Sequence, residues 1–152
     1  MKRLILLICV LFISIGLLSI PGYAVTGNTC TEIQYLDDGG YIITTIEESA
    51  SRATNSKTAT KKETQYDSDG SLDWQILLRG TFTYNGTTSV CTASTVTVNI
   101  YDTAYSKDSS SATKSGNTAY GSATIKRKVL GVTIATNTYN LTLSCDKDGN
   151  LS

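Results

Sequence analysis

Among the side chains that most often carry out catalysis, this chain of 152 residues has carboxylates but no histidine. Histidine is the usual base of serine and cysteine hydrolases and the commonest metal ligand, so activities that depend on it are excluded. Carboxylates could still supply an acid and a base, but their spacing selects no pair, and adjacent glutamates in a strand would point to opposite faces. We expect neither an enzyme nor a cofactor. The glutamates considered are Glu32, Glu47, Glu48 and Glu63.

Two short acidic segments resemble each other, Asp67–Leu72 and Asp146–Leu151. Aspartates at alternate positions before a glycine are typical of calcium loops, in which oxygens from successive residues converge on one cation. In the helix-loop-helix calcium site, however, glycine is sixth and a glutamate ends the loop, whereas here glycine is fourth and no such glutamate follows. A turn that is capped by aspartate and contains a glycine of positive φ explains the same residues. The pattern favours turns, and we expect no metal site.

The first 24 residues have the composition of a secretory signal peptide. Two basic residues precede an apolar run at 4–20, and the small residues Gly22 and Ala24 precede the expected cut, as signal peptidases require. We expect cleavage between Ala24 and Val25, which leaves one secreted β domain at 25–152. The alternative is a membrane anchor, because an apolar run of about 17 residues approaches the length that spans a bilayer. Cleavage is favoured because a helix-breaking proline lies beside the site.

Export would change the net charge of the chain, because the signal peptide is removed, and would place the protein outside the cell. Without its two N-terminal basic residues the chain has 11 basic and 13 acidic residues, which gives no electrostatic reason to expect nucleic acid or membrane as a partner after cleavage. The basic run Lys126–Lys128 is divided between two faces by strand alternation, and we expect a solvated edge that discourages aggregation. The predicted location is extracellular, either in the medium or loosely associated with the cell wall.

Three cysteines remain after cleavage: Cys30, Cys91 and Cys145. A disulfide can persist outside the cell membrane. Three pairings are open, and all three thiols could instead stay reduced. We favour Cys91 with Cys145 because both lie in strands of the predicted core, which leaves Cys30 as the odd thiol. Closing a loop of this size would stabilise the fold by about 4 kcal/mol in the chain-entropy view.

The clearest strand is predicted at 72–84, where large and polar residues alternate. Asn85-Gly86 follows, the preferred pair for a two-residue hairpin turn in which both residues have positive φ. The chain is expected to return as a strand at 87–100. The residues expected on the buried face of this hairpin are Trp74, Ile76, Leu78, Gly80, Phe82, Tyr84, Val90, Val96, Val98 and Ile100.

Further segments complete the predicted fold. A strand at 57–66 would lie at a sheet edge, and the serine-rich segment 103–117 is the best candidate for a mobile loop. The last strand is expected to change face through a bulge near 136–138. About six or seven strands, after an N-terminal signal helix, predict an all-β fold that is an antiparallel β-sandwich or a flattened barrel. The remaining strands are predicted at 31–36, 41–47, 119–129 and 132–145.

Four segments occur together in this chain: Gly80–Thr87, Cys91-Thr92, Gly116–Ala119 and Leu141–Asp146. As a set they resemble small secreted proteins of Gram-positive bacteria that form a domain family of unknown function. The similarity covers about residues 74–152. It implies a shared β fold and the pairing of Cys91 with Cys145, and it carries over no catalytic or binding residue.

Three functions are compatible with these features. The first is a non-catalytic secreted or surface-associated domain that binds a protein or glycan at the cell surface, which export, the lack of histidine and the tyrosines favour. The second is a bacteriocin-like toxin. The third, less favoured, is a hydrolase that uses carboxylates and would need a cleft with two acids of displaced pKa. We take the first as the prediction; its tyrosines are Tyr101, Tyr105 and Tyr120.

Overall fold

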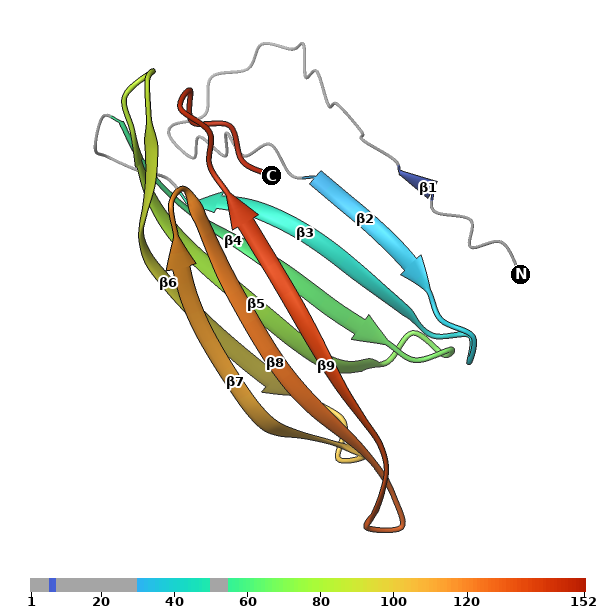
Figure 1. Cartoon of the computed structure of the whole chain (residues 1–152). Coiled ribbons are helices and arrows are strands. Elements are labelled where there is room, and N and C mark those ends of the chain that lie inside the picture. Colours follow the sequence, from blue (N-terminus) through green and yellow to red (C-terminus); the bar gives the residue numbers. More distant parts are fainter. Residues whose placement is uncertain (1–5, 8–29, 50–54) are drawn as a thin grey trace, which may run out of the picture.

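Two antiparallel β-sheets face each other in this protein (Figure 1). The computed structural model describes residues 6–7, 30–49 and 55–152, and within them there is no helix, hence none able to cross a membrane. The larger sheet contains β1 (Leu6–Leu7), β2 (Cys30–Tyr35), β3 (Tyr41–Ser49), β4 (Ser56–Tyr66), β5 (Leu72–Tyr84) and β6 (Ser89–Ile100). The smaller sheet contains β7 (Tyr105–Ser115), β8 (Thr118–Val129) and β9 (Val132–Ser144).

The strands follow each other in chain order across each sheet, and the link from β6 to β7 is the one that changes sheet. The two-residue β1 adds to the edge of β2. The predicted all-β class is confirmed as two open sheets, not a closed barrel, and the eight longer strands exceed the six or seven expected. Apart from Leu6–Leu7, the predicted signal segment 1–24 and its cleavage site lie outside the described residues.

The core lies between β5 of the larger sheet and the hairpin β8–β9 of the smaller one. Alternate residues of β5 are fully buried, as their period of two predicts. The facing strand β8 contributes small side chains, and at Gly121 a Cβ atom would lie only 2.5 Å from a methyl group of Val96, so the sheets approach closely there. The largest fully buried side chains are Trp74, Phe82, Ile76, Leu78, Leu141 and Leu143.

Two segments differ from the sequence-based expectation. Residues 103–117 do not form a long loop, because 105–115 are the edge strand β7, paired along its length with β8. Most of its side chains are exposed, so the apolar alternation that marks a strand is absent from its sequence. The strand predicted at an edge, β4, lies inside the sheet between β3 and β5.

The connection from β5 to β6 is longer than the two-residue turn that Asn85-Gly86 predicts. The paired strands end at Tyr84 and Ser89, so residues 85–88 form the loop. Gly86 alone has a positive φ, 81°. Asn85 keeps an ordinary φ, and its side-chain oxygen accepts hydrogen bonds from the two backbone N–H groups that end the loop. Side-chain capping thus replaces the left-handed geometry expected of Asn85.

Bulges reassign two predicted faces. A register shift opposite Thr81 and Phe82 turns Cys91 inward and leaves Val90 half exposed, although the alternation predicts Val90 on the buried face. The bulge expected near 136–138 of the last strand is real but lies earlier, at Ile134. An extra residue in one strand reverses the face on which the following side chains lie. The alternation of the sequence alone does not predict where such a residue occurs.

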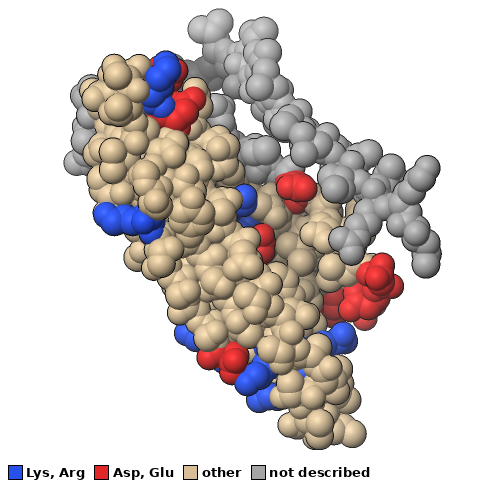
Figure 2. All heavy atoms as spheres, viewed as in Figure 1, with Lys and Arg blue, Asp and Glu red and all other residues tan. Residues whose placement is uncertain are grey.

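The surface of the described chain is mostly uncharged. Figure 2 shows one face, on which lysine, arginine, aspartate and glutamate side chains are scattered singly or in small groups among uncharged residues. The composition agrees, with 17% charged residues in the chain. The parts of this surface therefore differ in how their few charged side chains are arranged, which the net charge of the chain does not describe.

Candidate functional site

Two of the glutamates considered as catalytic residues are engaged in ion pairs. Glu47 lies 2.9 Å from the amine of Lys62, and Glu48 lies 3.1 Å from that of Lys57. As adjacent residues of β3 they lie on opposite faces of the sheet, as predicted. The structure therefore does not bring these two carboxylates together.

Glu32 and Glu63 lie on one face of the larger sheet, on strands that flank β3, because both are in register with Thr44. Burial raises the pKa of Glu63, and the negative charge of Glu32 adds to this rise while Lys61 opposes it. Two strand spacings separate the two glutamates, about 10 Å. Neither glutamate lines the cavity described below.

The two acidic segments form the same turn. In each, the first aspartate accepts hydrogen bonds from the backbone N–H groups two and four residues later, at 2.9 and 2.8 Å in both cases. Gly70 and Gly149 occupy the fourth position with φ of 83° and 89°. The turn interpretation is confirmed. Among the described residues, no group of three or more potential ligand side chains is arranged to hold a metal ion.

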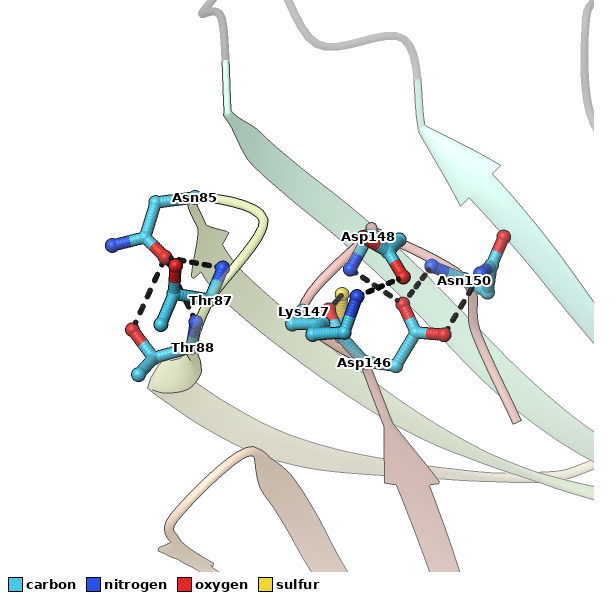
Figure 3. Close-up of polar contacts among 8 residues, drawn as sticks. Asn85, Thr87, Thr88, Asp146, Lys147, Asp148 and Asn150 are labelled. Atoms are coloured by element: carbon cyan, nitrogen blue, oxygen red, sulfur yellow. Dashed lines mark hydrogen bonds and ion pairs between the residues drawn. The ribbon is translucent and has the colours of Figure 1, made fainter.

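The second of these turns is hydrogen-bonded to the β5–β6 loop, and Figure 3 draws the polar contacts within each of the two. The N–H of Gly86 donates a 2.8 Å hydrogen bond to the carbonyl of Lys147. The side chain and backbone N–H of Asn150 donate to Asp146 and hold its pKa below the usual range. Every polar group of Asp146 is thus used within the turn, and the arrangement serves structure.

Cys91 and Cys145 are both buried, and both are free thiols, so the structure does not bear out the predicted disulfide. Burial raises the pKa of each thiol. Their backbone N–H groups donate to neighbouring carbonyls of the β7–β8 turn, those of Gly116 and Asn117, at 2.8 and 3.1 Å. The two cysteines therefore flank one turn of the same core. For Cys30 only the backbone lies within the described residues.

A cavity of about 190 Å³ opens where the ends of the two sheets meet, and its lining is more polar than apolar. The larger sheet contributes the ends of its hairpins, and the smaller sheet contributes the start of β7 and the end of β8. Four aspartates line the cavity against one arginine, so hydrogen-bond acceptors predominate. The side chains that matter below are Asp38, Gln65, Asp67, Asp73, Asp102, Tyr105 and Arg127.

Asp73 is the least exposed carboxylate of this cavity, at 3% of its surface. Alternation predicts that it faces water, but a bulge opposite Gln65 and Tyr66 makes Asp73 the unpaired extra residue and turns its side chain inward. There the amide of Gln65 donates to its carboxylate at 2.9 Å. Burial raises the pKa of Asp73, and the neighbouring Asp102 adds to the rise.

Tyr105 and Arg127 complete the cavity from the smaller sheet. The Tyr105 hydroxyl accepts a 3.1 Å hydrogen bond from Gln65, and burial, with the charge of Asp73, raises the pKa of Tyr105 to about 12. The guanidinium of Arg127 lies 6.0 Å from the centre of the Tyr105 ring and 3.5 Å from the carboxylate of Asp38. Arg127 therefore pairs with Asp38, and Asp73 forms no ion pair among the described residues.

Sequence reasoning singled out only some of these residues. It marked Tyr105 as a possible contact residue and placed Arg127 in a basic edge, but it assigned no role to Gln65 or Asp73. The missed signal is the bulge, since one extra residue before a strongly alternating strand re-aims the side chain at its start. Of the other predicted contact tyrosines, Tyr101 and Tyr120 are exposed and lie outside the cavity.

No protein-family model, curated protein or solved structure matches this chain. The similarity to secreted proteins of Gram-positive bacteria therefore stays a prediction, and the site rests on its own geometry.

Proposed function

We propose that this protein is an exported, non-catalytic domain that binds the end of a glycan at a cell surface, in the cavity around Asp73. The observation that carries the proposal is a buried carboxylate, held by Gln65 beside Tyr105, that faces a polar cavity without a cationic partner. A ligand rich in hydroxyl groups supplies the hydrogen-bond donors that such a cavity lacks.

The placement of Asp73 favours a functional explanation because it opposes folding. A buried carboxylate whose pKa is raised is less stable when ionised than it is in the unfolded chain. Such groups cluster at sites where chemistry or binding requires them. The Gln65 amide and the Tyr105 hydroxyl are the side-chain donors to Asp73, and we assign the remaining acceptor capacity of its carboxylate to a ligand.

The size and lining of the cavity favour a single sugar ring. Its volume of about 190 Å³ lies below the range of roughly 300–1,000 Å³ that holds drug-sized ligands. Sugar recognition uses planar polar side chains to bind hydroxyl groups, and an aromatic ring to cover the apolar face of the sugar. Asp73 and Gln65 supply the planar polar groups, and the aromatic side chain of Tyr105 lines the cavity beside them.

A glycan array followed by calorimetry tests the proposal. The wild type is expected to retain at least one class of glycan. The variant Asp73→Asn keeps the shape and the acceptor for Gln65 but removes the charge, and we expect it to lose at least tenfold in affinity. The control Asp148→Asn removes one exposed carboxylate at the other end of the molecule and should bind like the wild type.

Two results would overturn the proposal: an array on which nothing is retained, or equal affinity of the wild type and Asp73→Asn. Capture of a protein partner with unchanged affinity for Asp73→Asn would likewise place recognition outside this cavity. Export is tested separately by sequencing the N-terminus of the protein in the culture medium, which is expected to begin at Val25.

A further inference from the structure

The turn that joins β8 to β9 contains a leucine, Leu130, in a backbone conformation that disfavours leucine. Leu130 and Gly131 form this two-residue connection with φ of 50° and 80°. Positive φ at both positions is usual for Asn-Gly or Gly-Gly, whereas a leucine there brings its Cβ against the backbone. Leu130 is 99% exposed, so no packing within the described chain compensates for this strain.

Leu130 belongs to an exposed apolar group, which we call the apolar tip: Val129, Leu130, Val132 and Ile134. Their exposures run from 49% to 99%, and they make up half of the large exposed hydrophobic residues in the described chain. In Figure 1 this hairpin projects beyond the other strands at the bottom of the view. Apolar residues gathered on one projecting element indicate an interaction surface.

Basic residues stand directly behind the apolar tip. The hairpin from Thr118 to Ser144 has no aspartate or glutamate and three basic residues, the basic run 126–128 at the end of β8. Lys126 pairs with Asp108 and Arg127 with Asp38. Lys128 forms no ion pair with any residue that the structure describes. Figure 2 shows the uncharged tip with lysine and arginine side chains above it and acidic side chains beside them.

We propose that the apolar tip inserts into the interfacial layer of a lipid bilayer that contains anionic lipids, with the basic run at the level of the phosphates. The shape favours lipid over a protein partner, because a bilayer closes around a projecting hairpin while a protein would need a matching groove. In an extended strand Lys128 lies roughly 7 Å behind Leu130. Elements that lie in the interface are buried by about 5–10 Å.

This proposal revises the expectation of no membrane partner after signal cleavage. That expectation used the net charge of the whole chain, which averages the acidic cavity with the basic hairpin. Attraction to an anionic surface depends on the charges that come within a Debye length of it, about 8 Å at physiological ionic strength. Near the apolar tip, Asp108 and Asp38 pair with two of the three basic residues, which leaves Lys128 as the basic residue without an ion pair among the described residues. The proposal does not depend on the glycan proposal.

Fluorescence from a tryptophan placed at the tip tests insertion directly. The chain has one tryptophan, Trp74, which is fully buried and supplies a constant background. With vesicles of phosphatidylglycerol and phosphatidylcholine, the Leu130→Trp variant is expected to shift its emission to the blue and to be quenched by lipids labelled on their acyl chains. Tyr120→Trp, at the other end of β8, is the matched control and should show neither change.

The same design separates the tip from any contribution of the N-terminal apolar segment. If only that segment binds vesicles, the protein co-floats with lipid while the emission of Leu130→Trp stays unchanged, and the proposal is overturned. An unchanged emission with every vesicle composition has the same meaning and leaves a protein partner as the occupant of the tip.

Vesicle flotation measures the two contributions. Leu130→Asn is expected to lower partitioning into anionic vesicles at least tenfold, because it replaces the most exposed apolar side chain with a polar one. Lys128→Gln is expected to lower it about fivefold, as the loss of one basic residue near an anionic surface predicts, and to have no effect with phosphatidylcholine alone. Equal partitioning of both variants and the wild type would contradict the proposal.

Discussion

The two ends of the molecule treat conformational strain and buried charge differently. At one end, which we call the loop end, the β5–β6 loop and the C-terminal turn have glycine wherever φ is positive, and Asp146 has its carboxylate saturated with hydrogen bonds and its pKa lowered. At the other, the tip end, Leu130 adopts a positive φ and Asp73 is buried with a raised pKa.

The difference indicates that the residues unfavourable to stability lie at the tip end. The glycines and the Asp146 carboxylate of the loop end suit their local geometry, as in a region selected to hold the fold together. Strained backbone and unpaired buried charge persist when surrounding structure holds them, and they concentrate at sites of interaction. The tip end has one of each, at the apolar tip and in the cavity. We therefore place both proposed functions at the tip end.

The largest expected effect compares two glycines with similar backbone geometry. Gly149 has a φ of 89° and a Cβ there would lie 2.7 Å from the Tyr84 ring, whereas at Gly131, with a φ of 80°, nothing lies within 4 Å. Gly131→Ala should cost about 1 kcal/mol of unfolding free energy through backbone strain alone. Gly149→Ala should cost about 2–3 kcal/mol, since the ring must also move.

Urea unfolding measures both glycine variants, provided that the slope with denaturant is unchanged. Equal losses would show that Tyr84 yields freely to a methyl group and that the C-terminal turn is not packed tightly against the β5–β6 loop.

A smaller loss is expected at Asn85. Its side-chain oxygen accepts hydrogen bonds from the N–H groups of Thr87 and Thr88 at 3.0 and 2.8 Å. Asn85→Ala removes this cap and should cost about 1 kcal/mol, while Asn85→Asp keeps the acceptor and should remain close to the wild type. If both variants lose the same stability, the loop is held by other contacts and its local fit is weaker than we infer.

Several local features, most of them at the loop end, show how much of the fold the sequence predicts. The alternation of β5 gave its limits and its buried face correctly, and the acidic turns were correctly interpreted, because both signals are local. Asn85-Gly86 was misleading, since the same asparagine can adopt positive φ or cap with its side chain, and the choice depends on the register of the flanking strands. Strand β7 was missed because an exposed edge strand needs no apolar residues.

The tip end was largely hidden from the sequence for a different reason. Asp73 is polar at a polar position of its strand, and only a bulge turns it into the cavity. In the turn Leu130-Gly131, the first residue is a leucine, where asparagine, aspartate or glycine is usual. At Asp73 the structure departs from strand alternation, and at Leu130 it departs from the residue preference of the turn. A prediction based on these local rules therefore misses the residues that we consider functional.

A gain of stability is expected from the strained residue of the tip end. Asparagine tolerates positive φ better than leucine does, and Leu130 has no packing to lose, so Leu130→Asn should raise the unfolding free energy by about 0.5–1 kcal/mol. Leu130→Ala, which keeps the strain and removes most of the apolar side chain, should change it little. A loss of stability in Leu130→Asn would mean that Leu130 supports the fold and that its exposure has no functional meaning.

The smallest expected difference between the ends is one of pH dependence. The pKa of Asp73 is raised by burial, so its folded form is relatively most stable below about pH 4, the unfolded value, and loses stability as the pH rises through the folded pKa. The pKa of Asp146 is lowered by hydrogen bonds, so its contribution is present above about pH 4 and is lost as the pH falls through the lowered pKa.

Urea midpoints of the wild type, Asp73→Asn and Asp146→Asn at pH 3, 5 and 7 measure these opposite dependences, because each substitution removes one charge and keeps one acceptor. From pH 3 to pH 7 the wild type should lose stability relative to Asp73→Asn and gain it relative to Asp146→Asn. Parallel curves would show that Asp73 is ionised in the folded state without penalty. The cavity would then have no excess of unfavourable charge for a ligand to relieve, and the contrast between the two ends would rest on Leu130 alone.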